Sequence, residues 1–187
     1  MSRRLLGLLP LSFFVIHGSR HVAAGQAYEL FWACTTASLL IGLGILTDTR
    51  RLTASAVLWL PIGNVMWIYD AVHTGLIMWT SLLTHVGTLL IALWSLRSQG
   101  FPRGSFVTAT ILGMLLQLIS HYVTPYQSNV NVSQFIYPGS ESLFPSYGHY
   151  VAATWVLCCA SFYLIEKLCL RILPSPSSAL VDVSINQ

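Results

Sequence analysis

The chain has 187 residues, of which 55% are hydrophobic and only 8% are charged, and its mean hydropathy is +0.68. Soluble domains carry about 25% charged residues, so this composition excludes an ordinary soluble protein. From the length, we expect one domain and no separate soluble catalytic domain. The net charge of +3 does not indicate nucleic-acid binding, because the nine Lys and Arg residues are scattered at the ends of apolar segments.

Six apolar segments follow one another, each close to the length of about 20 residues that a helix needs to cross a bilayer. They run over Leu5–Ala24, Tyr28–Leu46, Ala54–Val72, Trp79–Leu96, Ser105–Val123 and Tyr150–Leu170. The first resembles a signal peptide, but Pro10 and the lack of a clear cleavage site favour a retained helix. We therefore expect an all-α bundle of six transmembrane helices over residues 1–173. Residues 174–187, rich in Ser and Pro, are expected to form a disordered cytoplasmic tail.

Positive charge falls almost wholly on one side of this six-span arrangement. Eight of the nine Lys and Arg residues lie at the same ends of the segments, and Arg20 alone lies at the other. Cytoplasmic loops carry an excess of Lys and Arg, so the sequence predicts that both termini are cytoplasmic. All six histidines then fall in the extracytoplasmic or lumenal half. The long loop 124–149 lies there too, and its Asn131-Val132-Ser133 matches the acceptor pattern for N-glycosylation.

His85 is the sharpest candidate for a functional residue. Ser81, Thr84, His85 and Thr88 lie at i, i+3, i+4 and i+7, so they form one polar stripe on a helix whose other faces are apolar. An ionisable residue within a membrane is energetically costly, so it is by default a functional hypothesis. We expect the stripe to face the interior of the bundle, with the His85 ring neutral and hydrogen-bonded.

Three residues of the second segment are candidate nucleophiles for a general base at His85. Cys34, Thr35 and Thr36 lie six to eight residues from the start of their segment, and His85 lies six residues from the start of its own. At 1.5 Å per residue, all four positions are about 9–12 Å below the outer surface. A hydroxyl or thiol and its general base require such equal depth. Hydrogen bonding between helices is the alternative role for Thr35 and for Ser38.

The other histidines suggest a metal site on the same side of the membrane. His17 and His21 have i, i+4 spacing, so both rings could share one helix face as ligands of an ion such as zinc. The residues that would complete such a site are His73, His121, His149 and Asp70. The alternative is that these rings lie at the interface because it suits an amphipathic side chain. Asp70 or His121 is also expected to orient a catalytic His85.

Four short motifs in the second to fifth segments form a set. They are Gly44-Ile45-Leu46-Thr47-Asp48, Pro61-Ile62-Gly63 followed by Trp67-Ile68-Tyr69-Asp70, Leu83-Thr84-His85, and Ile136-Tyr137-Pro138. Together they resemble the androgen-induced and androgen-dependent membrane hydrolases. The resemblance implies six spans and cleavage of fatty-acid esters of hydroxy fatty acids by a helix-two threonine and a helix-four histidine, here His85. The family's threonine position falls near Leu30, so the nucleophile stays open among Thr36, Thr35 and Cys34, of which the cysteine would suit a thiol hydrolase or acyltransferase.

The sequence therefore predicts a multi-pass membrane protein that acts, without a cofactor, on a lipid ester at its extracytoplasmic or lumenal face. Two other classes remain open: a small-molecule, metal or proton-coupled transporter or sensor that uses the histidine-rich face, with zinc as the candidate metal, and an accessory subunit of a membrane complex. The expected partners are the lipid bilayer and a lipid substrate, with a second copy of the chain or another membrane subunit as the protein partner.

Overall fold

Every regular element in the described residues is a helix. The computed structural model describes residues 3–75 and 77–173. The helices are α1 (Leu8–Ala23), α2 (Ala33–Leu46), α3 (Arg50–Thr74), α4 (Trp79–Leu82), α5 (Thr88–Gln99), α6 (Ser105–Val123) and α7 (Tyr147–Ile172). A π-helical turn, η3 (Leu83–Gly87), joins α4 and α5 into one rod, so the expected all-α fold of six helices is confirmed. Residues 174–187, expected to be a disordered tail, lie outside the described part.

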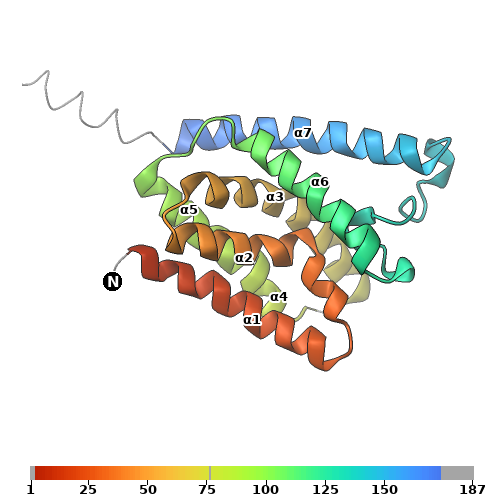
Figure 1. Cartoon of the computed structure of the whole chain (residues 1–187), viewed down its shortest axis with the longest axis horizontal. Coiled ribbons are helices and arrows are strands. Elements are labelled where there is room, and N and C mark those ends of the chain that lie inside the picture. The colour runs from red at the N-terminus through yellow and green to blue at the C-terminus, as the bar shows by residue number, and fades with distance from the viewer. Residues whose placement is uncertain (1–2, 76, 174–187) are drawn as a thin grey trace, which may run out of the picture.

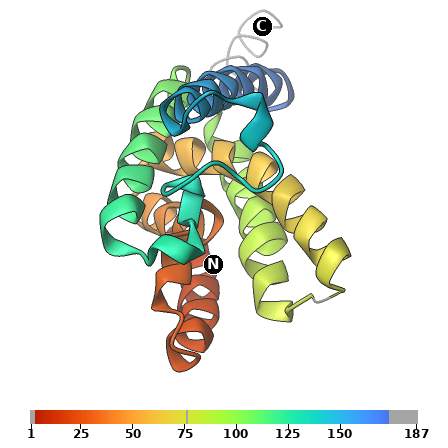
Figure 2. The same cartoon turned by 90° about the vertical axis from the view of Figure 1, so that its right-hand side faces the viewer.

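The six rods form a bundle with α2 at its centre. In Figure 1, α6 and α7 lie along one side and α1 along the other, with α2 and α3 between them. Ala37, Ser38, Ile41 and Ile45 of α2 are completely or almost completely buried, because α2 has neighbours on several sides. Figure 2 shows the C-terminal end of α1 diverging from the α3–α4 hairpin. The start of α1 and the end of α7 lie at the same end of the bundle (Figure 1).

Among the described residues, five helices are long and apolar enough to cross a membrane. They are Arg3–Ala23, Arg50–Thr74, Trp79–Gln99, Ser105–Val123 and Tyr147–Ile172. Large apolar side chains such as Val156 and Leu164 are exposed on the outside of α7, as a bilayer setting requires. By helix length and hydropathy, the chain is therefore a multi-pass membrane protein.

Helix α2 is shorter than the second expected span, Tyr28–Leu46. It has 14 residues, or about 21 Å, against about 30 Å of bilayer hydrocarbon. The expected helix over Tyr28–Leu46 is broken because Ala27–Phe31 forms a 3-10 turn, η2, and Trp32 has extended backbone with φ −57° and ψ 138°. The α-helix therefore begins only at Ala33.

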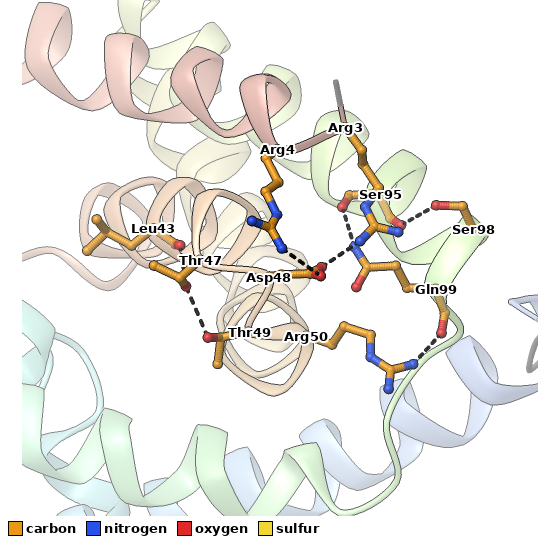
Figure 3. A network of polar contacts seen from close by, with 10 residues as sticks. All are labelled: Arg3, Arg4, Leu43, Thr47, Asp48, Thr49, Arg50, Ser95, Ser98 and Gln99. Carbon is orange, nitrogen blue, oxygen red and sulfur yellow. Dashed lines mark hydrogen bonds and ion pairs between the residues drawn. The ribbon is translucent and has the colours of Figure 1, made fainter. Parts of the chain in front are cut away.

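The turn between α2 and α3 ties several helix ends together (Figure 3). Asp48 adopts a left-handed backbone conformation with φ 58°, and its carboxylate lies 2.5 Å from Arg3 and 3.7 Å from Arg4. Arg50 donates from Nη1 to the carbonyl of Gln99 at 2.7 Å, which joins the start of α3 to the end of α5. The motif that ends in Asp48 therefore has a local structural role.

Asn131 fastens the long loop to the start of α2. Its Oδ1 accepts a hydrogen bond from the amide of Ala33 at 3.0 Å. Its Nδ2 donates to the Phe31 carbonyl at 2.7 Å and to Ser120 Oγ at 2.9 Å. The side-chain amide thus caps the first turn of α2 from 98 residues away. Because both of its polar atoms are engaged, Asn131 does not present a free amide for glycosylation in the folded chain.

Replacing Asn131 by Asp should destabilise the fold. A carboxylate still accepts from Ala33, but it cannot donate to Phe31 or Ser120, and each buried group left unpaired costs about 1–3 kcal/mol. We expect the thermal unfolding midpoint in detergent, followed by tryptophan fluorescence, to fall clearly below that of the wild type. The matched control is Gln127→Glu, at an exposed amide of the same loop. Equal midpoints for the two variants would show that Asn131 does not hold the loop.

Candidate functional site

The polar stripe of the fourth rod lies on the π-helical turn. The Thr88 amide bonds to the carbonyl of Leu83, whereas in an α-helix it would bond to Thr84. The Thr84 carbonyl thus freed accepts a hydrogen bond from Ser38 Oγ of α2 at 3.2 Å. Thr88 Oγ1 lies 2.9 Å from the same Ser38 Oγ, so the two hydroxyl groups also share a hydrogen bond. Isolated π-helical turns are rare and occur frequently at functional sites.

The His85 side chain is buried and held from two sides. The residue is 7% exposed, and Ser81, Thr84 and Thr88 are buried as well, which confirms that the stripe faces the interior of the bundle. Nδ1 lies 2.9 Å from the Ser81 carbonyl and 3.3 Å from Ser81 Oγ. The ring stacks on the indole of Trp67, with 4.8 Å between centroids. Because a carbonyl only accepts, a neutral ring carries its proton on Nδ1 and leaves Nε2 as an acceptor.

The Cys34 thiol packs against Gly63 of α3. Cys34 is 9% exposed, and a Cβ added at Gly63 would overlap Cys34 Sγ. Gly63 and Trp67 are four residues apart, so they share one face of α3 and are separated by about 6 Å along its axis. The thiol of Cys34 and the ring of His85 therefore contact the same face of α3, one helical turn apart.

The two threonines beside Cys34 have other surroundings. Thr36 Oγ1 donates to the Leu30 carbonyl of its own chain segment at 3.2 Å. Thr35 is buried, and no hydrogen bond joins either threonine to His85 in the described part of the chain. The α2 hydroxyl that meets the polar stripe is Ser38, which sequence analysis assigned only to bonding between helices. The sequence does contain a pattern that points to Ser38: it lies four residues after Cys34, so the two side chains share one face of the helix.

Asp70 and His121 do not approach the His85 ring through any described contact. Asp70 is exposed near the end of α3, in electrostatic range of Glu29. His121 bonds through Nδ1 to the Ser133 carbonyl at 2.7 Å, on the side of α6 that faces the long loop. The Ser81 carbonyl, a backbone group, is the hydrogen-bond partner of His85 Nδ1. Sequence analysis expected the side chain of Asp70 or His121 to orient the ring.

The four candidate metal ligands fall into one pair and two separate residues. His17 and His21 face each other, with 3.2 Å between their Nε2 atoms, and His17 Nδ1 lies 3.1 Å from Thr80 Oγ1. His73 Nδ1 lies 3.0 Å from the carbonyl oxygen of Tyr69, one turn earlier in α3. Among the described residues, no group of three or more His, Cys, Asp or Glu side chains is arranged to hold a metal ion.

His149 has a helix-capping role instead. It lies three residues after Ser146, the N-cap of α7, and Ser146 Oγ accepts from the His149 amide at 3.4 Å. The same oxygen lies 2.8 Å from His149 Nδ1. Both contacts stabilise the first turn of α7.

These features define a helical membrane protein with a buried thiol and a buried imidazole on one face of its third helix. Comparison of the chain with models of protein families, with curated proteins and with solved structures finds no match. Three residues of the motifs that carry the resemblance have structural contacts in this fold: Asp48 pairs with Arg3, Gly63 packs on Cys34, and Trp67 stacks on His85. The resemblance to the androgen-induced and androgen-dependent hydrolases therefore stays a prediction.

Proposed function

We propose that the chain is an intramembrane acyl-transfer enzyme, a hydrolase or acyltransferase of a lipid ester, with Cys34 as nucleophile and His85 as general base. The observation that carries this proposal is the shared face of α3, where Cys34 contacts Gly63 and His85 stacks on Trp67. A nucleophile and its base must lie close together. Contacts on one face of α3 that are about 6 Å apart along its axis support this pairing.

The hydrogen bonds of the site support the choice of residues. The Ser81 carbonyl selects the tautomer of His85 whose Nε2 has a free lone pair, which is the state that a general base needs. Thr36 uses its hydroxyl proton on the Leu30 carbonyl. Of the three candidates on α2, Cys34 also has the most nucleophilic side chain.

The proposed reaction has two balanced steps. Cys34 Sγ attacks the ester carbonyl carbon while its proton passes to His85 Nε2, and the C–O bond then breaks as the leaving alcohol takes that proton. The resulting thioester is attacked by water or by a second lipid alcohol, whose proton passes to His85 Nε2. The C–S bond breaks, and the Cys34 thiolate regains a proton from the imidazolium. Water as the acceptor makes the enzyme a hydrolase, and an alcohol makes it an acyltransferase.

Acyl trapping tests this proposal. The reconstituted protein is incubated with p-nitrophenyl esters of short and long fatty acids and then analysed by mass spectrometry of the intact chain and its peptides. We expect one acyl group on Cys34 that hydroxylamine releases, as it releases thioesters. Cys34→Ala should lose the adduct, whereas the matched control Cys158→Ala, on α7, should keep it. An adduct on another residue, or none with any ester, would contradict the proposed nucleophile.

We further infer that the chain crosses the membrane six times, with the turn η2 and helix α2 together forming the second crossing. Both termini are then cytoplasmic, because the Lys and Arg residues divide eight to one. The test uses single cysteines introduced at two exposed positions, Ser98 before the α5–α6 turn and Gln127 in the long loop. In intact cells, an impermeant maleimide should label the cysteine at 127 and spare the one at 98 until the membrane is permeabilised. Equal labelling of both would overturn the orientation.

One observation favours a second candidate function, a zinc-binding transporter or sensor. The separation of 3.2 Å between the Nε2 atoms of His17 and His21 matches two ligands of one tetrahedral ion with zinc–nitrogen bonds of about 2.0–2.1 Å. Elemental analysis of the purified wild-type protein and of His21→Asn distinguishes a zinc-binding protein from the proposed acyl-transfer enzyme. Zinc that copurifies with the wild type and is lost from the variant would support it, and metal-free wild type would exclude it.

A further inference from the structure

A hollow lined by three cations lies between the start of α6 and the last turns of α7. Arg103 comes from the turn before α6, and Lys167 and Arg171 come from α7. All three side chains are exposed. The α5–α6 turn and the end of α7 lie at the same end of the bundle as the start of α1 (Figure 1). His85 is 14 residues from the end of α5, or about 21 Å along the rod, so the hollow is separate from the candidate catalytic site.

The acid in the hollow, Glu166, forms no ion pair with these cations. Its side chain is 4% exposed, and both carboxylate oxygens are used by the first turn of α6. Oε1 accepts from the Gly104 amide and Oε2 from the Phe106 amide, each at 2.8 Å. The carboxylate thus complements the partial positive charge at the N-terminus of α6.

Among the described residues, no other acidic side chain forms an ion pair with these cations. The ion pairs found within residues 3–75 and 77–173 both use Asp48, so none involves the three cations of the hollow. Lys167 Nζ lies 5.1 Å from the centroid of the Tyr163 ring, which keeps the ammonium group beside the hollow. The hollow therefore holds three unpaired cations against one carboxylate, an excess of positive charge that can attract an anion.

The remaining walls are apolar and lead to the lipid-facing surface. Phe106 packs edge-to-face on Tyr163 with 5.4 Å between ring centroids, and Leu170 also lines the hollow. Leu164 and Leu168, within four residues of Lys167 on α7, are exposed apolar side chains. A ligand held here by its anionic group would have its apolar part against the outside of the bundle, where the acyl chains of the bilayer lie.

We propose that this hollow binds the phosphate group of an anionic phospholipid. Arg103 and Arg171 each offer a planar set of donors that matches two phosphate oxygens, and Lys167 supplies a point charge. Basic pockets between membrane helices on the cytoplasmic side bind such headgroups. A phospholipid is the source that the apolar walls favour over free phosphate, because only a lipid uses both the charge and the adjoining apolar surface. This site does not depend on the proposed catalysis.

The test measures lipid retention by native mass spectrometry of the purified full chain. The protein is mixed in a neutral detergent with equal amounts of phosphatidic acid and phosphatidylcholine, and the variants are Lys167→Gln, Arg171→Gln and Arg103→Gln, singly and together. We expect phosphatidic acid to be retained in preference, with affinity about fivefold weaker for each cation removed. The matched control is Arg97→Gln, an exposed cation at the same end of the bundle that does not line the hollow, and it should retain the preference.

A second arm of the experiment distinguishes the lipid from free phosphate. Inorganic phosphate in millimolar excess should not displace phosphatidic acid, since it lacks the apolar part. Displacement by inorganic phosphate, or retention of phosphatidylcholine at the same level, would overturn a phospholipid site. An unchanged preference in the triple variant would overturn the assignment to this hollow. The variants change exposed side chains and keep Glu166, and unfolding midpoints equal to the wild type would establish that lost binding does not reflect lost structure.

Discussion

His85→Gln should slow acylation of Cys34 by about 10²–10⁴-fold, the range that a positioned general base contributes. Glutamine has a side-chain amide that can donate to the Ser81 carbonyl, as His85 Nδ1 does now at 2.9 Å. It also fills part of the space against Trp67. It cannot accept and release a proton near neutral pH. The unfolding midpoint should therefore stay close to that of the wild type while the acyl adduct forms far more slowly.

The control for this prediction is His73→Gln, the same change at an exposed histidine of α3. Its acylation rate should equal that of the wild type. A His85→Gln protein that is folded and acylated at the wild-type rate would remove His85 from the reaction. A His85→Gln protein that unfolds would instead assign His85 a structural role, through its contacts with Ser81 and Trp67.

Much of the bundle could be predicted from hydropathy and periodicity. The spacing of Ser81, Thr84, His85 and Thr88 correctly predicted a buried stripe, because in a membrane polar side chains turn toward other helices. The expected boundaries of the helix over Ser105–Val123 match α6. Both predictions rest on local patterns, in which each residue's environment follows from its neighbours along the helix.

The features that were missed depend on contacts between distant parts of the sequence. The break at Trp32 is accompanied by the cap that Asn131 supplies to Ala33 from 98 residues away. The π-helical turn leaves Thr84 with a free carbonyl, which is satisfied by Ser38 from another helix, 46 residues away. No local pattern encodes such partners, so sequence analysis predicted two regular helices at these places.

The position of the nucleophile shows the same limit. Depth could be predicted for Cys34, Thr35 and Thr36, since the rise per residue of a helix is constant. Rotation about the axis of α2 could not, because a helix that is apolar on all sides carries no pattern that distinguishes its faces. In the structure, Cys34 faces Gly63 of α3, whereas Thr36 bonds back to Leu30. Residues that are neighbours in the sequence of α2 therefore point in different directions around its axis and have different contacts.

Gly63→Ala should destabilise the protein, although alanine is intrinsically the better helix residue by about 1 kcal/mol. The added methyl group would overlap Cys34 Sγ, and inserting a methyl group into a well-packed interior costs about 1–3 kcal/mol. The measurement is the free energy of unfolding in detergent, followed by tryptophan fluorescence. The control is Gly148→Ala on α7, where the nearest atom to an added Cβ is Ser146 Oγ at 3.8 Å, and this variant should be at least as stable as the wild type.

The double variant Gly63→Ala/Cys34→Ala should recover the stability that Gly63→Ala loses. Removing Sγ vacates the volume that the new methyl group needs, so the two changes should couple by about 0.5–3 kcal/mol, as changes at contacting residues do. The same contact places the Cys34 thiol one turn from Trp67 and His85, so Gly63→Ala alone should also slow acylation of Cys34. Additive effects on stability would show that the thiol does not pack on Gly63. The shared face of α3, and with it the pairing of Cys34 and His85, would then have no support.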